Sequence, residues 1–317
     1  MTEPLRISAR EIPAPSSLSP QAQEALSMRT TPPVFPPIDD PGAWERLIAE
    51  LDAEVEQLIG HITEHVRSNI VDTTVDGVSA YVATPQEIRA GGSGTVCLEL
   101  HGGGLYQGGG GIARAVAGAT ADMRRLIVIS PDYRMPPRHP YPVALEECLT
   151  VYRALVDEHG AENIIVSGSS AGGNLAAALT LRARDEGTPM PVALVLSSPE
   201  VDLTESGDTF ATLSGIDSLD SLGPVNELYA AGADLRDPYL SPLFADFGPG
   251  FPRTFLQSGT RDLYLSNTVR LHRALRNAGV PVECHIFEGR PHLGFGGATI
   301  EDGEVMAEID RFIQSLL

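Results

Sequence analysis

Short apolar runs, each ended by polar or turn-forming residues, recur from about residue 70 to the end of the chain. Stretches with the apolar spacing of helices lie between several of these runs, at about 142–158, 171–185, 264–278 and 302–316. Fully apolar strands that alternate with helices indicate a mostly parallel sheet covered on both faces. We therefore predict an α/β fold with eight strands, at 70–75, 78–82, 95–100, 126–130, 163–167, 192–197, 254–257 and 282–287.

Two segments do not fit this alternation. Residues 1–40 are interrupted by prolines, and a long amphipathic helix is expected from Pro41, with apolar positions between Leu47 and Val66. About fifty residues between Pro199 and Phe251 form a connection too long for a plain strand-to-helix loop. We predict that the two segments form a cap over the carboxyl edge of the sheet, where such folds bind ligands.

Charge narrows the classes of partner. The chain of 317 residues has 42 acidic and 22 basic residues, giving a net charge of −20. Such a chain repels nucleic acid and anionic membranes, so we expect neither as a partner. All of its basic residues are arginine, which excludes a Schiff-base lysine and a phosphate-loop lysine.

The cysteines and the start of the chain suggest a cytoplasmic protein. Cys97, Cys148 and Cys284 lie too far apart for a Cys-x-x-Cys metal pair, and their odd number does not suit a disulfide framework. We expect three buried thiols in a reducing compartment. The first ten residues carry three charged side chains and no apolar core, unlike a secretory signal peptide, and no apolar run reaches the length of a membrane span.

The strongest chemical signal is the segment 168–172, Gly-Ser-Ser-Ala-Gly, between a predicted strand and a predicted helix. It fits the Gly-x-Ser-x-Gly nucleophile elbow, in which a serine sits on a strained turn before a helix. The helix N-terminus supplies amides that face developing negative charge. The pattern makes Ser170 a candidate nucleophile.

Three further segments complete this picture. Residues 101–104, His-Gly-Gly-Gly, follow a strand and suit the other half of an oxyanion hole, although a flexible glycine loop is the alternative. Asp262 and His292 follow the last two predicted strands, so both are expected at the same sheet edge as Ser170. Their order in the chain, serine, acid and then histidine, is that of α/β-hydrolases.

Together these motifs identify a resemblance to the hormone-sensitive-lipase-like group of α/β-hydrolases, in its bacterial carboxylesterase branch. The resemblance also rests on Asp132-Tyr133-Arg134, the segment 139–142 (His-Pro-Tyr-Pro) and Ser241-Pro242-Leu243. It implies the α/β-hydrolase fold for residues 67–317, with 1–66 and 203–237 as two parts of a helical cap. It implies a triad of Ser170, Asp262 and His292 and an oxyanion hole formed by the amides of Gly103, Gly104 and Ala171.

The implied activity is hydrolysis of short-chain or compact carboxylic esters through an acyl-enzyme, without a metal or organic cofactor. Tyr106, Ser169, Tyr264 and Phe295 are expected to line the substrate site, and a homodimer is expected by analogy. Ser169 and Leu265 stand where the family usually has acids. A lactone or amide hydrolase with the same triad and a non-catalytic ligand-binding protein are the alternatives, and the segment 61–65, His-Ile-Thr-Glu-His, leaves a zinc peptidase as a third.

Overall fold

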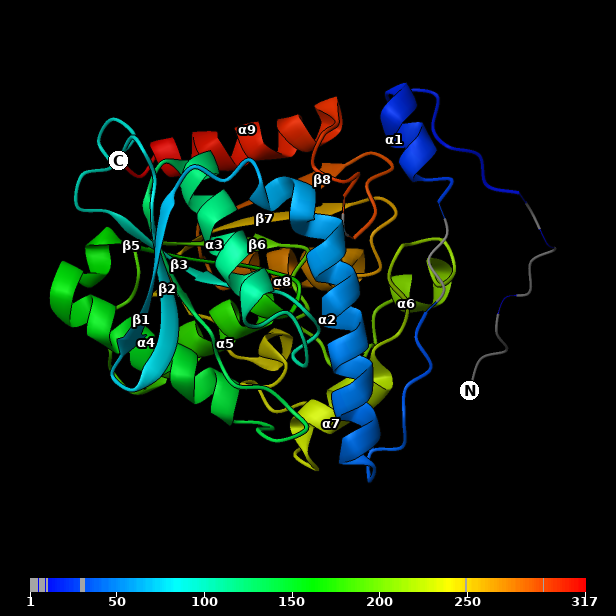
Figure 1. Ribbon diagram of the computed structural model, residues 1–317, viewed down its shortest axis with the longest axis horizontal. Helices are drawn as coiled ribbons and strands as arrows, with labels where there is room; N and C mark the ends of the chain where they lie inside the picture. Colours follow the sequence, from blue (N-terminus) through cyan, green and yellow to red (C-terminus); the bar gives the residue numbers. More distant parts are fainter. Residues whose placement is uncertain (1–4, 6–8, 10, 29–31, 249, 293) are drawn as a thin grey trace.

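The structure is a computed structural model that describes residues 5, 9, 11–28, 32–248, 250–292 and 294–317. One eight-stranded sheet runs through the centre of the molecule in the order β1-β2-β4-β3-β5-β6-β7-β8 (Figure 1). β2 is antiparallel to both β1 and β4, and the other neighbours are parallel. The strands are β1 (Asn69–Val75), β2 (Val78–Thr84), β3 (Val96–Leu100), β4 (Ile127–Pro131), β5 (Ile164–Ser169), β6 (Ala193–Ser197), β7 (Arg253–Gly259) and β8 (Val282–Phe287).

Helices cover both faces of this sheet. α4, α5 and α8 pack on one face, and α3 and α9 pack on the other. The long α2 runs beside α3, and α6 and α7 belong to the connection between β6 and β7 (Figure 1). The α-helices are α1 (Pro20–Ala25), α2 (Pro41–Thr63), α3 (Gly111–Arg124), α4 (Val143–His159), α5 (Ala171–Asp185), α6 (Thr209–Thr212), α7 (Gly223–Ala230), α8 (Leu265–Asn277) and α9 (Ile300–Gln314).

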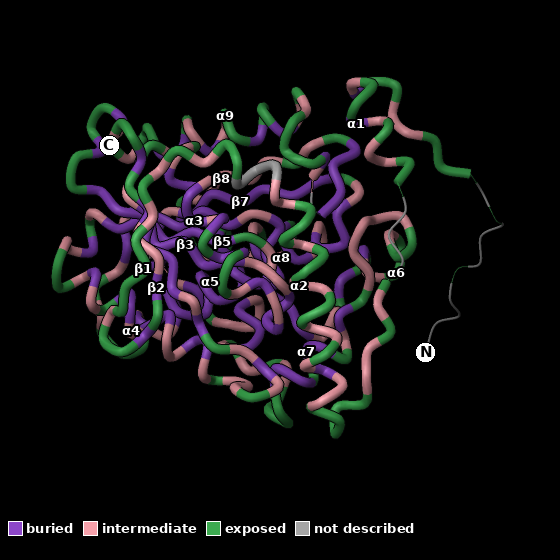
Figure 2. The backbone as a smooth tube through the Cα atoms, in the orientation of Figure 1, coloured by how far each residue is buried: buried purple, intermediate pink, exposed green. Residues whose placement is uncertain are grey.

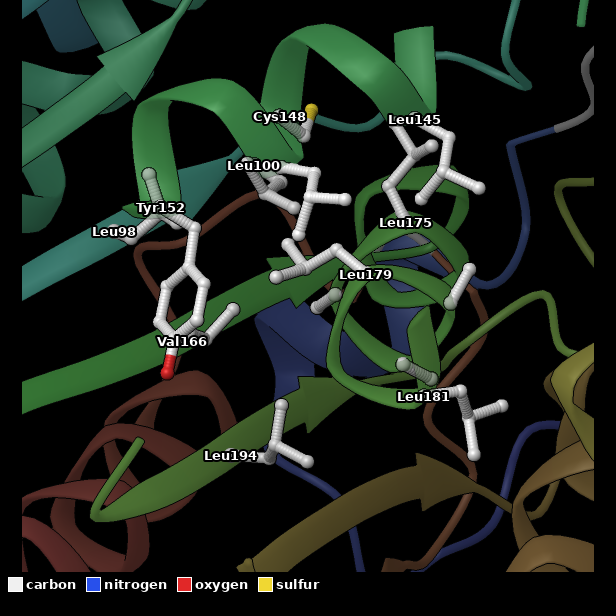
Figure 3. Packing of buried hydrophobic residues seen from close by; sticks show 14 of the residues in the cluster. Leu98, Leu100, Leu145, Cys148, Tyr152, Val166, Leu175, Leu179, Leu181 and Leu194 are labelled. Carbon is white, nitrogen blue, oxygen red and sulfur yellow. The ribbon is translucent and has the colours of Figure 1, made fainter. Parts of the chain in front are cut away.

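The core follows from the two-residue period of the strands. On β5, Val166 faces the cluster built with α4 and α5, whereas its neighbour Ile165 faces the cluster built with α9. The larger cluster brings leucines of β3 and α5 together with Tyr152 of α4 (Figure 3). β3 is buried along its whole length, and β5 is buried up to Gly168 (Figure 2). Each fully buried aliphatic side chain contributes roughly 1.5–3 kcal/mol, so this two-sided burial stabilises the sheet.

The structure confirms the predicted strands and helices to within two residues at nearly every end. The sequence reading missed α3, which follows the glycine run 108–111 and buries mainly alanines. It also predicted three buried thiols, which is wrong for one of them. Cys97 and Cys148 are buried, but Cys284 on the edge strand β8 is partly exposed.

The two segments outside the alternating pattern meet each other. Trp44 of α2 and Val225 of α7 belong to one buried cluster, which also contains Tyr106 and Leu222. Trp44 is fully buried, and its ring lies edge-on to that of Tyr106, with centroids 6.2 Å apart. The expectation that residues 1–66 and 203–237 form a separate cap domain remains a prediction.

Candidate active site

Ser170 lies on a strained turn between β5 and α5. Its backbone angles are φ 56° and ψ −122°, and residues other than glycine rarely adopt a positive φ of this kind. The turn brings α5 very close to β3. A Cβ atom at Gly172 would stand only 1.9 Å from the carbonyl oxygen of Leu100 on β3. Glycine at this position lets α5 approach the sheet, and the approach presents Ser170 at the carboxyl edge.

The structure brings Ser170, His292 and Asp262 into one hydrogen-bonded chain. The Nε2 atom of His292 lies 2.9 Å from Oγ of Ser170, and its Nδ1 atom lies 3.0 Å from Oδ1 of Asp262. With Nδ1 protonated, the ring donates to Asp262 and accepts the serine hydroxyl proton at Nε2. The loops after β5, β7 and β8 supply these three side chains, as the sequence predicted.

Asp262 is fully buried and richly hydrogen-bonded. Its Oδ2 accepts the hydroxyl of Ser258 at 2.6 Å, and its Oδ1 accepts the backbone N–H of Tyr264 at 2.9 Å. Burial alone would raise its pKa, but the neighbouring His292 and the hydroxyl of Ser258 hold the pKa of Asp262 below its ordinary value. Asp262 is therefore suited to remain an anion and to orient the imidazole.

His292 is surrounded by acids. Burial disfavours its charged form, but Asp262 and then Asp217 and Glu200 favour it, and together they raise the pKa of His292 above 6.5. This arrangement favours the imidazolium, the form that His292 would take on accepting a proton from Ser170. The ring is also held by Tyr264, which lies edge-on to it with centroids 4.8 Å apart.

The glycine loop after β3 lies against the nucleophile turn. Gly103 has φ 120°, and a Cβ atom there would stand 2.0 Å from the carbonyl oxygen of Gln107, so the loop requires glycine. A Cβ atom on Gly102 would be 3.6 Å from that of Ser170. Gly104 follows with φ 59°, and Ala171 is the first residue of α5, where the N–H lacks a helical partner. The oxyanion-hole role of these amides remains a prediction.

Asp132 and Tyr133, which follow β4, contact this glycine loop. The ring of Tyr133 stacks on His101 at 4.0 Å, and its hydroxyl donates to the carbonyl oxygen of His101 at 2.7 Å. Asp132 accepts the backbone N–H of Gly110 at 2.8 Å. These contacts fix the start and the end of the loop.

The four predicted substrate-site residues occupy different places. Tyr264 touches His292, and Tyr106 lies in the aromatic cluster between α2 and α7. Ser169 is exposed and lines a cavity of about 260 Å³ between α3 and α9, which His292 also lines. Phe295 is buried in a separate cluster under α1. Contact of these residues with a substrate remains a prediction.

Sequence reasoning missed two acids near His292. Glu200 is fully buried three residues after β6, and burial raises its pKa to about 7. Its backbone N–H donates to the carbonyl oxygen of Ser170 at 3.1 Å. Its position after a strand is the signal that also led to Asp262. The second acid, Asp217, lies in the long connection and had no comparable signal.

The described part of the chain contains no group of three or more His, Cys, Asp or Glu arranged to hold a metal ion. The side chain of His61, one of the two histidines in the zinc-peptidase alternative, lies outside the described residues. Among the described helices, none combines the length and apolar character needed to span a bilayer.

The proteins that resemble this chain in sequence and in structure are esterases and other α/β-hydrolases. A family described as alpha/beta hydrolase fold matches residues 97–295. An esterase of Acinetobacter venetianus is 33% identical over 243 residues, which are 73% of this chain and 78% of the esterase. The crystal structure of an esterase E25 has a TM-score of 0.89 and 33% identity and covers 98% of both chains. A structure titled hormone-sensitive lipase from a metagenome library has a TM-score of 0.78 and 30% identity, and covers 90% of this chain and all of the other.

Proposed function

Because this chain belongs to the α/β-hydrolase family, as an esterase-type enzyme similar to bacterial members of the hormone-sensitive lipase group, we propose that it hydrolyses carboxylic esters through an acyl-serine intermediate. Ser170 is the nucleophile, His292 the general base and Asp262 the residue that orients the base. The observation that carries this proposal is the chain of two contacts, 2.9 and 3.0 Å long, which links the three side chains.

The proposed reaction has two steps. His292 takes the hydroxyl proton of Ser170 as Oγ attacks the ester carbonyl, and the protonated imidazole then gives that proton to the leaving alcohol. A water molecule, deprotonated by His292, attacks the acyl-enzyme, the bond between the acyl carbon and Oγ breaks, and His292 returns the proton to Ser170 as the acid leaves. In both steps the amides of Gly103, Gly104 and Ala171 stabilise the tetrahedral oxyanion, and one such donor contributes about 3 kcal/mol.

Short-chain or compact esters are the proposed substrates. The buried hydrophobic cluster that contains Trp44, Tyr106 and Leu222 supports this choice, because side chains of Tyr106 and Leu222 fill the space beside Gly104 of the glycine loop. A long acyl chain would have to displace them. The homodimer and the cytoplasmic location remain predictions beside this proposal.

The test is hydrolysis of p-nitrophenyl esters with acyl chains from two to twelve carbons by the wild type and Ser170→Ala. Ser315→Ala, just after α9, is the matched control, because within the described part of the chain its hydroxyl donates only to the carbonyl oxygen of Phe312. We expect rapid wild-type turnover of short esters, an undiminished control and a loss in Ser170→Ala of roughly 10⁶-fold in kcat.

Other outcomes separate the alternatives. Near-normal turnover by folded Ser170→Ala would overturn the assignment of the nucleophile. A folded wild type that hydrolyses no ester in the series, but does hydrolyse a lactone or an amide, would retain the triad and change the substrate class. Inactivity on all three classes would favour a ligand-binding protein. Inhibition by a chelator alone would favour the zinc peptidase.

A further inference from the structure

One carboxylate from the long connection bridges the two loops that carry the triad acid and base. The Oδ1 atom of Asp217 accepts the backbone N–H of His292 at 2.8 Å. Its Oδ2 atom accepts the backbone N–H of Leu263, the residue after Asp262, at 2.5 Å. Asp217 itself lies between β6 and β7, so a third segment of the chain joins the other two.

The bridge acts where the sheet no longer holds the loops. β7 and β8 pair as far as Gly259 and Phe287, and two bonds beyond them, from Thr260 to Phe287 and from Arg261 to Arg290, extend this pairing. Asp262 and His292 lie further out. Because the carboxylate accepts the N–H of His292 itself and that of Leu263, next to Asp262, it ties together the two loops whose side chains make the 3.0 Å contact.

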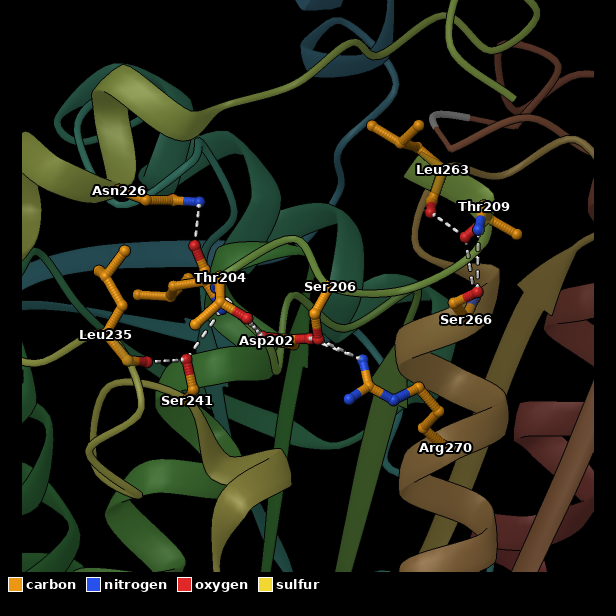
Figure 4. A network of polar contacts seen from close by, with 11 residues as sticks. Asp202, Thr204, Ser206, Thr209, Asn226, Leu235, Ser241, Leu263, Ser266 and Arg270 are labelled. Carbon is orange, nitrogen blue, oxygen red and sulfur yellow. Dashed lines mark hydrogen bonds and ion pairs between the residues drawn. The ribbon is translucent and has the colours of Figure 1, made fainter. Parts of the chain in front are cut away.

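The same connection also binds the backbone carbonyl group of Leu263. The hydroxyl of Thr209, at the start of α6, donates to the carbonyl oxygen of Leu263 at 2.6 Å (Figure 4). The start of the connection is anchored in turn, because Asp202 pairs with Arg270 of α8 at 2.6 Å. The acid loop is thus attached to an insertion that is itself fastened to the catalytic body.

The negative charge of the Asp217 carboxylate also acts on His292. Burial raises the pKa of Asp217, whereas His292 beside it has the opposite effect. Asp217 in turn favours the protonated form of His292, as Asp262 and Glu200 do. A carboxylate at this position therefore both holds the backbone of His292 and favours the imidazolium formed during proton transfer.

We propose that Asp217 is a positioning residue, through which the insertion between β6 and β7 holds the Asp262 and His292 loops in their catalytic geometry. The inference rests on the proposed function for its catalytic consequence. Its structural half, the fixation of the two loops, stands on the hydrogen bonds alone. Misplacement of a catalytic group by about 1 Å can cost roughly 10²-fold in rate, which sets the scale expected on loss of the bridge.

The experiment compares Asp217→Ala and Asp217→Asn with the wild type. Asp220→Asn is the matched control, because the recorded bonds of Asp220, to Ser214 and Ser221, stay within the same insertion. Steady-state kinetics on a short ester give kcat and KM. Hydrogen exchange reports on the backbone N–H groups of Leu263 and His292.

We expect Asp217→Ala to lose roughly 10- to 100-fold in kcat with little change in KM, and to exchange both N–H groups faster. Asp217→Asn keeps one acceptor oxygen and the side-chain volume, so its losses should be smaller; it also serves if the alanine variant does not fold. Asp220→Asn should match the wild type.

Unchanged kcat and unchanged exchange in both Asp217 variants would overturn the proposal, and so would a change in KM alone. Failure of the proposed function gives a different result, because the wild type would then hydrolyse no ester. In that case faster exchange at Leu263 and His292 in Asp217→Ala would still support the bridge, and unchanged exchange would still contradict it.

Discussion

The Nε2 atom of His292 lies 2.9 Å from the Oγ atom of Ser170, although 122 residues separate them along the chain. The contact exists because β5 and β8 end at the same edge of one parallel run of strands. It joins a hydroxyl to an imidazole that Asp262 contacts from the other side. The predictions below concern this contact and the structures that hold it.

Asp262→Asn should fold normally and lose about 10⁴-fold in kcat. The amide has the size of the carboxylate, but it provides no negative charge for the imidazolium and favours the wrong imidazole tautomer. The measurement is kcat on a short ester, with the melting temperature as a check on folding. Asp72→Asn, which breaks a surface ion pair with Arg114, is the control and should leave kcat unchanged. Full activity of Asp262→Asn would point to another orienting acid.

The pH dependence of kcat/KM should follow the deprotonation of His292. Only the neutral imidazole can accept the proton of Ser170, so activity should fall as pH decreases through the pKa of His292. Burial alone would lower that pKa, but Asp262, Asp217 and Glu200 raise it. We therefore expect the acid limb of the profile to have its midpoint above pH 6.5 for a neutral ester. A midpoint clearly below 6.5 would contradict this account of the site.

Glu200→Gln should stabilise the protein at pH 8 more than at pH 4.5. Burial raises the pKa of Glu200 to about 7 from 4.5, so the folded state retains a proton that the unfolded state has lost. The wild type therefore loses stability as pH rises between these values, by about 3 kcal/mol from this group. Glutamine does not titrate and removes that loss.

Urea unfolding of the wild type and Glu200→Gln at pH 4.5 and 8 measures this difference. Glu304→Gln, at an exposed position of α9, is the control and should show no comparable pH-dependent gain. Equal effects of Glu200→Gln at the two pH values would mean that Glu200 ionises in the folded state as it does in the unfolded state.

Gly172→Ala should destabilise the fold strongly, whereas Gly303→Ala should not. The new Cβ atom at residue 172 would meet the carbonyl oxygen of Leu100 at 1.9 Å, and backbone would have to move. We expect a loss of about 3 kcal/mol or more in the free energy of unfolding. Gly303 lies on the exposed side of α9 with open space beside it, so alanine there should stabilise by up to ~1 kcal/mol. Similar effects of the two substitutions on chemical denaturation would contradict the close approach of α5 and β3.

The sequence predicted that Ser170, Asp262 and His292 lie at one edge of the sheet because each residue has a local signal. Ser170 stands in a glycine-flanked turn, and Asp262 and His292 each follow an apolar run that forms a strand. Strands buried on both faces can be recognised in the sequence as apolar runs. In a parallel sheet, the loops that follow the strands all lie at the carboxyl edge of the sheet. Contacts within this scaffold could therefore be predicted without coordinates.

Other features depend on tertiary contacts that leave no such signal. α3 was missed because it follows a glycine run and its buried side chains are mainly alanine, which gives weak apolar periodicity. Asp217 is one of several acids in a polar connection, and its partners Leu263 and His292 lie 46 and 75 residues away. Only the packing of that connection against the sheet edge distinguishes it from its neighbours.

The most direct test of the central claim is to find which residue a serine-directed covalent inhibitor modifies. The wild type, Ser170→Ala and His292→Ala would each react with a fluorophosphonate probe, and mass spectrometry of the digested chain would locate the adduct. The account predicts rapid modification of Ser170 in the wild type, none at that position in Ser170→Ala and much slower modification in His292→Ala. An adduct on another residue, or labelling of Ser170 at the same rate without His292, would contradict it.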